Sequence, residues 1–149
     1  MAPIQPGTKA PPAPGVAFDG PTALIFYKVT CPVCQLAGPP LDRLRNAFPD
    51  AVIAVGQDPP EKLEAFAREW RFRVPAVSDP PPYPISDAYG IRTVPTVFLV
   101  DRDGTVLETV ESWDREGFNR VSRRLAELTG TEYAEVSHPS DGLPAFRPG

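Results

Sequence analysis

The stretch from Ala23 to Pro40 constrains the fold of this chain more than any other part of it. It begins with the apolar, β-forming run ALIFY, which is typical of a buried strand. It then reaches Cys31 and Cys34, which are separated by two residues, and continues with a helical pattern. The sequence therefore predicts a strand, a Cys-x-x-Cys turn and a helix in direct succession.

The chemistry that this turn favours is thiol–disulfide exchange. Cys31 and Cys34 are the only cysteines of the 149-residue chain, and their spacing allows a small disulfide ring. The first sulfur would lie at the start of the helix, where free N–H groups and the helix dipole favour a thiolate. Because a thiolate is the form of cysteine that attacks disulfides, we interpret the two residues as a catalytic redox pair.

Length and charge exclude several other classes of function. A chain of this size can bury the core of one domain. Its 15 Lys and Arg against 19 Asp and Glu give a net charge of -4, which offers no basis for binding nucleic acid or an anionic membrane. The sequence has no apolar run of about 18 residues and no secretory signal pattern. We expect a cytoplasmic location, although the mature part of an exported protein would begin in the same way.

Hydrophobic periodicity and turn signals give the order of the other elements. Predicted strands cover residues 23–28, 51–55, 72–77, 95–100 and 105–111. Predicted helices run from 34 to 48, 58 to 70 and 115 to 129, with one helical turn near 86–89. The early β-α-β-α-β order favours parallel strands, and Asp103-Gly104 signals an antiparallel hairpin. The predicted fold class is α/β, with a central mixed sheet flanked by helices.

Two aspartates are predicted to begin helices. Asp58 precedes Pro59 and lies three residues before Glu61, which is the spacing of a capping box. Asp114 is predicted to cap the last helix, and Gly130 to end it. The apolar stripe of that last helix consists of Phe118, Val121, Leu125 and Leu128.

The 21 prolines indicate where regular structure stops, because proline removes a backbone donor. They concentrate in the first 20 residues, in residues 75–84 and near the end of the sequence. We therefore expect an irregular lead-in over residues 1–15, one domain over residues 16–130 and a tail over residues 131–149. Within the first 20 residues, Val16 to Phe18 is the only expected anchor to the core.

Two separated motifs resemble those of thioredoxin-fold proteins. The first contains Phe26-Tyr27 and the Cys-Pro-Val-Cys sequence, with Pro39 five residues after the second cysteine. The second is the sequence YGIRTVPT at residues 89–96, which resembles the cis-proline loop of that family and is followed by the hairpin signal. Two motifs in this order are a more specific signal than a lone Cys-x-x-Cys.

The resemblance extends over about residues 16–129. The elements between the two motifs, at about residues 56–77, resemble the β-α insertion of the TlpA/ResA-like and peroxiredoxin-like branches of the AhpC/TSA-redoxin superfamily. The resemblance therefore implies a thioredoxin-like fold with a redoxin-type insertion, and a thiol–disulfide oxidoreductase of the TlpA/ResA-like kind.

The same resemblance implies roles for individual residues. Cys31 would be the attacking thiolate, and Cys34 the buried thiol that resolves the mixed disulfide. Val94-Pro95 would form a cis peptide bond beside the cysteines. The backbone of Val94 would then pair with an extended substrate segment, as an added strand does.

Four more residues near the cysteines are candidates for the site. Pro32 and Val33, between the cysteines, would contribute to substrate binding. Lys28, three residues before Cys31, would lower the pKa of that thiol if its ammonium lay close by. Tyr27 would pack beside the disulfide. The alternatives are a Lys28 side chain that points into water and a Tyr27 that only fills core.

Three departures from the thioredoxin pattern affect the expected chemistry. Ile25 stands six residues before Cys31, where thioredoxins have a buried aspartate, so Cys34 needs another proton acceptor. Thr30 replaces the tryptophan before the first cysteine. The dipeptide between the cysteines contains no histidine to stabilise the thiolate. We therefore expect a reducing or intermediate potential.

Three functions remain open from the sequence. The leading hypothesis is a protein disulfide reductase, which needs a disulfide-containing protein substrate and an external electron donor. A peroxiredoxin-like thiol peroxidase would oxidise Cys31 to a sulfenic acid, but Lys28 stands where those enzymes have a threonine. A thioredoxin-like binding module without catalysis is the third possibility.

No cofactor or metal is expected. A tetrahedral zinc site takes four ligands, and the chain offers two cysteines and one distant histidine, His138, which we expect to be a solvated tail residue. We expect the chain to be a monomer.

Overall fold

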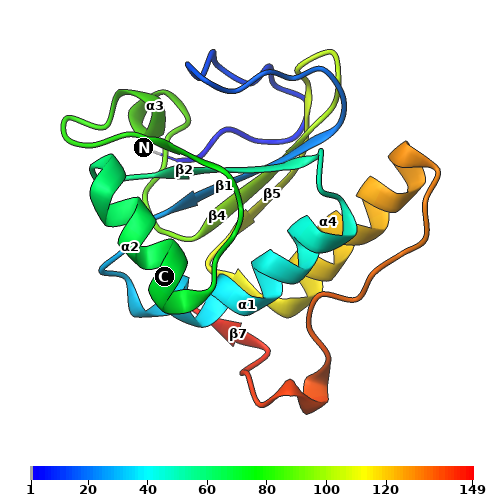
Figure 1. Ribbon diagram of the computed structural model, residues 1–149. Coiled ribbons are helices and arrows are strands. Elements are labelled where there is room, and N and C mark those ends of the chain that lie inside the picture. The colour runs from blue at the N-terminus through cyan, green and yellow to red at the C-terminus, as the bar shows by residue number, and fades with distance from the viewer. Residues whose placement is uncertain (1) are drawn as a thin grey trace.

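The computed structural model describes residues 2–149, which form a mixed sheet covered on both faces (Figure 1). The sheet has five strands, in the order β3-β2-β1-β4-β5. They are β1 (Thr22–Tyr27), β2 (Val52–Gly56), β3 (Ala76–Ser78), β4 (Thr96–Val100) and β5 (Val106–Glu111). The helices are α1 (Pro32–Ala47), α2 (Pro60–Trp70), α3 (Pro84–Ala88) and α4 (Arg115–Thr129). A two-stranded sheet joins β6 (Trp113–Asp114) to β7 (Phe146–Arg147), and a 3-10 helix covers Pro139–Asp141.

The directions of the strands confirm the predicted mixed sheet. β1, β2 and β3 are parallel, while β4 is antiparallel to both β1 and β5. The central strand β1 is buried along its whole length, as its continuous apolar sequence predicts. Because β1 and β2 are parallel, their carboxyl ends lie at the same edge of the sheet. That edge carries the cysteines.

The two faces of the sheet bury alternate residues of β1. Ala23, Ile25 and Tyr27 face the larger core, together with apolar residues of α1, α2 and α4. Leu24 and Phe26 face a second core, which α3 and the N-terminal segment cover. Figure 1 shows α1 and α4 on one side of the sheet and the N-terminal segment on the other.

The insertion between the two motifs consists of α2 and β3, but its boundaries differ from those predicted. The predicted strand over 72–77 is wrong for residues 72–75, because β3 begins at Ala76. The Arg73 N–H donates to the Asp42 carboxylate of α1 at 2.7 Å rather than to a strand. The buried side chains of Phe72 and Val74 fill the core beside α2. Residues 72–75 thus serve as a packed connection.

The prediction that Asp58 caps α2 is also wrong. The N-cap residue of that helix is Pro59, and no side chain caps it. The Asp58 carboxylate instead accepts a hydrogen bond from the Val29 N–H at 2.9 Å. By contrast, Asp114 caps α4 through the Gly117 N–H, and Gly130 ends that helix in the left-handed conformation, as predicted.

The N-terminal segment is anchored more extensively than Val16 to Phe18. The Gly7 N–H donates to the Val106 carbonyl at 2.9 Å, and the Val106 N–H donates to the Thr8 carbonyl at 2.8 Å. Ala13 is buried against the second core. The segment therefore pairs with the outer edge of β5, which would otherwise expose unpaired backbone groups.

Figure 1 shows residues 131–149 turning back from the end of α4. Their last residue, Gly149, packs against the backbone of Val94. Val136 is buried in the larger core, whereas His138 is exposed. Leu128, predicted to lie on the buried stripe of α4, is 40% exposed. Among residues 2–149, no helix has the length and apolar composition needed to cross a membrane.

Candidate functional site

The two cysteines lie where β1 leads into α1. Cys31 is the N-cap residue of α1, with extended backbone angles, and Pro32 occupies the first helical position. The Cys34 N–H donates to the Cys31 sulfur at 3.3 Å, so this sulfur replaces the usual capping oxygen. Cys34 is 3% exposed and Cys31 is half-buried, and both are free thiols. One sulfur can therefore meet a substrate while the other is shielded.

The two thiols have opposite acidities. Hydrogen bonding with the Cys34 thiol, assisted by the N–H groups of Cys34 and Val33, lowers the pKa of Cys31 to about 6 against the effect of burial. Burial raises the pKa of Cys34 far above its ordinary value, and its contact with Cys31 acts in the same direction. At neutral pH Cys31 is therefore a thiolate and Cys34 a thiol.

The turn before β4 lies against the Cys31 sulfur. The Val94–Pro95 peptide bond is cis, as the resemblance implied. The Cys31 sulfur lies 3.5 Å from the Val94 carbonyl oxygen, a hydrogen-bond distance for the protonated thiol. On its other side the turn is tied to the residue after β5, because the Ser112 N–H donates to the Pro95 carbonyl at 2.8 Å. The structure thus brings together the two motifs that the sequence singled out.

The loop that leads from β1 to Cys31 is held at both backbone groups of Val29. The Val29 N–H donates to the Asp58 carboxylate, and the Val29 carbonyl accepts from the Gln35 side-chain amide at 3.1 Å. The Cys31 N–H donates to the Lys28 carbonyl at 3.2 Å. These bonds fix the backbone that positions Cys31.

Asp58 is a residue of this site that the sequence interpretation assigned elsewhere. It is only 8% exposed, and its negative charge raises the pKa of both Cys34 and Tyr27, after the larger effect of burial. Its position after β2 was the signal that could have revealed it. Parallel strands bring their carboxyl ends to one edge, and the loop after β1 leads to the cysteines.

Lys28 does not contribute to the acidity of Cys31. Its ammonium donates to the Tyr83 hydroxyl at 3.3 Å and lies 5.3 Å from the centre of that ring. The causes of the lowered Cys31 pKa all lie within residues 33–34. The low pKa of Cys31 therefore comes from groups at the start of α1. Lys28 instead connects the loop before Cys31 to Tyr83, in the segment before α3.

Tyr27 belongs to the core beside the cysteines. Its ring packs against those of Phe66 and Phe72, with centroids 5.2 and 5.1 Å away. Burial raises its pKa, and the charges of Asp58 and Cys34 act in the same direction. Tyr27 is therefore a neutral hydroxyl next to the buried thiol.

The residues between the cysteines differ in exposure. Pro32 is exposed and Val33 is half-buried against the larger core. Val94 is half-buried and contacts both cores. Pro32 and Val94 therefore both keep some surface exposed near Cys31. The substrate-binding role expected for these residues stays a prediction.

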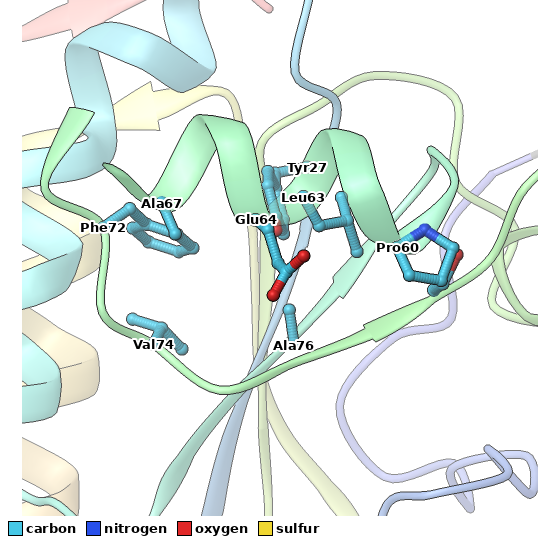
Figure 2. Close-up of a pocket in the computed structure, with 9 residues that line it drawn as sticks. Tyr27, Pro60, Leu63, Glu64, Ala67, Phe72, Val74 and Ala76 are labelled. Carbon is cyan, nitrogen blue, oxygen red and sulfur yellow. The ribbon is translucent and has the colours of Figure 1, made fainter. Parts of the chain in front are cut away.

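A cavity of about 350 Å³ lies between α2 and the connection to β3 (Figure 2). Its lining includes Tyr27, Leu63, Glu64 and Phe72 but neither cysteine. Tyr27 forms part of its wall and also lies near Cys34. The cavity is thus a neighbour of the redox pair and separate from it. Within residues 2–149, no three His, Cys, Asp or Glu side chains gather as a metal site would require.

The sheet, the cysteine pair at the start of α1 and the cis-proline turn together define a protein of thioredoxin-like fold. The thioredoxin domain of a thiol-disulfide oxidoreductase from Bacteroides vulgatus superposes with a TM-score of 0.69 at 21% identity, over 81% of this chain and 98% of that chain. A thiol:disulfide interchange protein of the thioredoxin family from Chlorobium tepidum TLS superposes with a TM-score of 0.63 at 17% identity, over 83% and 98%. These likenesses confirm the predicted fold.

The sequence comparison is more specific. Residues 16–109 match the AhpC/TSA family, and the chain belongs to that family. The thiol-disulfide oxidoreductase ResA of Halalkalibacterium halodurans is 29% identical over 89 residues, which are 57% of this chain and 50% of ResA. The chain thus spans half the length of the curated relative that it matches. The resemblance drawn from the two motifs is confirmed.

Proposed function

We propose that this chain is a thiol–disulfide oxidoreductase that reduces disulfide bonds of protein substrates. The observation that carries the proposal is the Cys31 sulfur, held as a thiolate at the N-terminus of α1 and next to the buried Cys34 thiol. ResA and the Bacteroides vulgatus protein, whose names state this activity, support it. The partners would be a protein disulfide and an external dithiol donor.

The reaction follows from the difference between the two sulfurs. The Cys31 thiolate attacks one sulfur of the substrate disulfide, so that a mixed disulfide forms and the other substrate sulfur leaves as a thiolate, which takes up a proton. Cys34 then loses its proton and attacks Cys31, which releases the second substrate thiol. The substrate gains two electrons and two protons, and Cys31 and Cys34 become a disulfide. The dithiol donor returns the pair to its reduced form.

In this proposal, the substrate binds at the cis-proline turn. The Val94 carbonyl lies 3.5 Å from the attacking sulfur. An extended peptide that pairs with the Val94 backbone would therefore bring its own cysteine to Cys31. This contact depends on main-chain atoms, which suits an enzyme that accepts several protein substrates.

The test is reduction of a disulfide-bonded protein such as insulin, with dithiothreitol as donor. Wild-type protein is expected to accelerate the reaction. Cys31→Ser is expected to leave only the uncatalysed rate, because the attacking group is lost. Cys34→Ser is expected to accumulate a mixed disulfide with the substrate, visible by mass spectrometry. Unchanged reduction by Cys31→Ser would overturn the proposal and favour a binding module.

The same variants distinguish a peroxidase. A peroxidatic Cys31 would consume hydrogen peroxide rapidly in Cys34→Ser and form a sulfenic acid that dimedone traps. The reductase proposal predicts slow peroxide consumption by both proteins. Rapid peroxide turnover without disulfide reduction would overturn it.

A further inference from the structure

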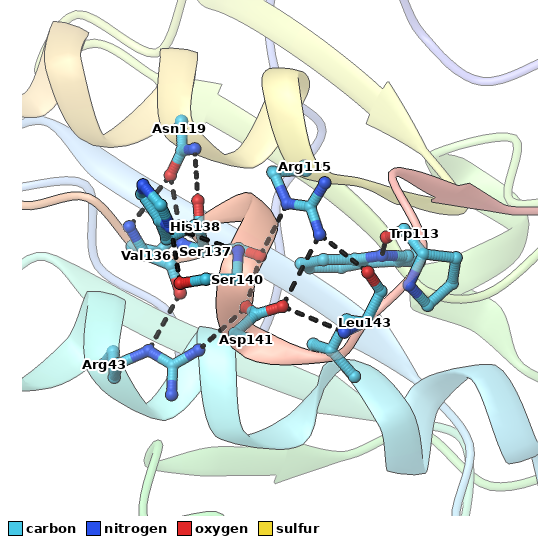
Figure 3. Close-up of polar contacts among 11 residues, drawn as sticks. Arg43, Trp113, Arg115, Asn119, Val136, Ser137, His138, Ser140, Asp141 and Leu143 are labelled. Carbon is cyan, nitrogen blue, oxygen red and sulfur yellow. Dashed lines mark hydrogen bonds and ion pairs between the residues drawn. The ribbon is translucent and has the colours of Figure 1, made fainter.

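The C-terminal segment is fixed to the body of the protein by a cluster of polar side chains (Figure 3). The Asn119 side chain accepts from the N–H groups of Val136 and Ser137 and donates to the Ser137 carbonyl at 2.8 Å. The Arg43 guanidinium of α1 donates to the Val136 carbonyl at 2.8 Å. Residues 136–137 are therefore bound from both α1 and α4.

A second set of bonds directs the chain from there back to the cis-proline turn. The Arg115 guanidinium donates to the Leu143 carbonyl at 2.7 Å, and the buried Trp113 indole donates to the Pro144 carbonyl at 2.6 Å. The Arg115 N–H donates to the Ala145 carbonyl at 3.0 Å. One guanidinium, one indole and one backbone N–H therefore bind three successive carbonyls. These bonds give residues 143–145 a defined path along the protein.

Beyond this path, residues 145–149 lead to the cis-proline turn beside Cys31. β7 pairs with β6, and the Gly149 N–H donates to the Ser112 hydroxyl at 3.1 Å. Gly149 is packed so closely that a Cβ atom there would collide with the Val94 carbonyl and lie 2.6 Å from the Thr93 hydroxyl. The Val94 carbonyl is the same group that approaches the Cys31 sulfur.

We propose that residues 145–149 are an internal cover that occupies the place of an extended substrate segment at Val94 and must be displaced before a substrate disulfide reaches Cys31. The inference rests on the proposed function for its substrate, but the contact with Val94 is independent of it. The cover would lower the reactivity of Cys31 until a suitable peptide competes for the same backbone.

The contacts of the cover are suited to displacement. All five residues from 145 to 149 are exposed, and a two-residue strand pair is weak by itself. The Thr93 hydroxyl is buried without a hydrogen-bond partner beneath Gly149. A substrate segment that offers this hydroxyl a partner would satisfy a group that the cover leaves unpaired.

The first test uses Gly149→Ala, because its methyl group cannot fit against Val94. Gly20→Ala is the matched control, since the space around that glycine is open. Alkylation of Cys31 by iodoacetamide is measured at pH 8, where the thiolate is fully formed. Release of the cover is expected to raise the rate about three- to tenfold in Gly149→Ala only. Equal rates in wild type and Gly149→Ala would overturn the proposal.

The second test shows whether residues 145–149 cover Cys31 or only stabilise the fold. A variant that ends at Pro144 is expected to alkylate as fast as Gly149→Ala and to show a higher kcat/KM for insulin. The peptide PAFRPG, residues 144–149, is expected to slow that variant, while its reversed sequence is not. Failure of the peptide to slow either reaction would overturn the proposal. Because alkylation needs no substrate, its rate tests whether residues 145–149 cover Cys31 even if the chain lacks reductase activity.

Discussion

The low pKa of Cys31 arises first from its hydrogen bond with the Cys34 thiol and then from the backbone N–H groups at the start of α1. No histidine lies between the cysteines, and the nearby Lys28 ammonium binds Tyr83 instead. The remaining sources are the Cys34 thiol and the N–H groups at the first turn of α1. A cysteine in the N-cap position thus achieves what a neighbouring cation achieves in other sites.

The pH dependence of Cys31 alkylation should follow this acidity. Since the pKa of Cys31 is about 6, its alkylation rate is expected to be low below pH 6, to rise through that value and to level off above it. An ordinary thiol would not level off until about pH 9 or higher. Iodoacetamide labelling of Cys34→Ser, read by mass spectrometry, isolates this sulfur. That variant also removes the thiol hydrogen bond, so wild type is labelled in parallel, and a midpoint near pH 9 in wild type would contradict the assignment.

The charge of Asp58 contributes to the raised pKa of Cys34. Asp58→Asn keeps an oxygen for the Val29 N–H but removes the charge that helps to raise the pKa of Cys34. In a Cys31→Ser background, alkylation of Cys34 at fixed alkaline pH is therefore expected to become severalfold faster, because each unit of pKa changes the thiolate fraction tenfold. The exposed Asp50 provides the control, as Asp50→Asn. If both substitutions leave the rate unchanged, Asp58 has no electrostatic influence on Cys34.

The start of the short helix α3 is stabilised by one buried carboxylate. Asp79, 1% exposed, accepts from the Ile85 N–H at 3.1 Å, from the Ser86 N–H at 2.8 Å and from the Ser86 hydroxyl at 2.7 Å. It therefore replaces the missing N-cap of this five-residue helix, since Tyr83 provides no side-chain cap. The helix in turn covers the second core through Ile85.

Asp79→Ala is expected to lower the free energy of unfolding by at least about 2 kcal/mol, because buried donors lose their acceptor. Denaturation by urea, followed by circular dichroism, measures this change. Asp87→Ala, an exposed carboxylate of the same helix, is expected to stay within about 0.5 kcal/mol of wild type. Equal losses in the two variants would show that Asp79 does not support α3.

The aspartates also show which part of the structure a sequence can predict. Asp114 bonds a group three residues away, so the local pattern identified its capping role correctly. Asp58 bonds Val29, and Asp42 bonds Arg73, across 29 and 31 residues. Those partners meet only after the sheet has formed, so local patterns gave Asp58 the wrong role and extended the third strand too far.

For the molecule as a whole, the mixed sheet and the redox pair were predictable because they follow from a buried apolar strand, a Cys-x-x-Cys turn, a hairpin signal and a proline motif. The path of residues 131–149 was not, because it depends on carbonyl groups that bind Arg43, Asn119 and Arg115. A polar segment with proline and glycine has the composition of a tail, and backbone bonding of this kind leaves no periodicity in the sequence.

The reduction potential of the Cys31–Cys34 pair depends on the pKa of the attacking cysteine. A stabilised thiolate favours the reduced form, so a lower pKa of the attacking cysteine makes the pair more oxidising. The Cys31 pKa of about 6 lies between about 7 for thioredoxin and about 3.5 for DsbA. The potential is therefore expected between about -270 and about -120 mV, and closer to the thioredoxin value.

Equilibration in glutathione buffers, with alkylated cysteines counted by mass, measures this potential. Gly149→Ala should leave it nearly unchanged if the cover contacts the reduced and oxidised pair equally, since a group that binds two states equally shifts no equilibrium. A potential near -120 mV would instead assign the chain to oxidation of protein thiols, with electrons flowing from substrate to Cys31. Failure to form the disulfide in any buffer would contradict the two-cysteine reaction itself, because that reaction requires Cys34 to reach Cys31.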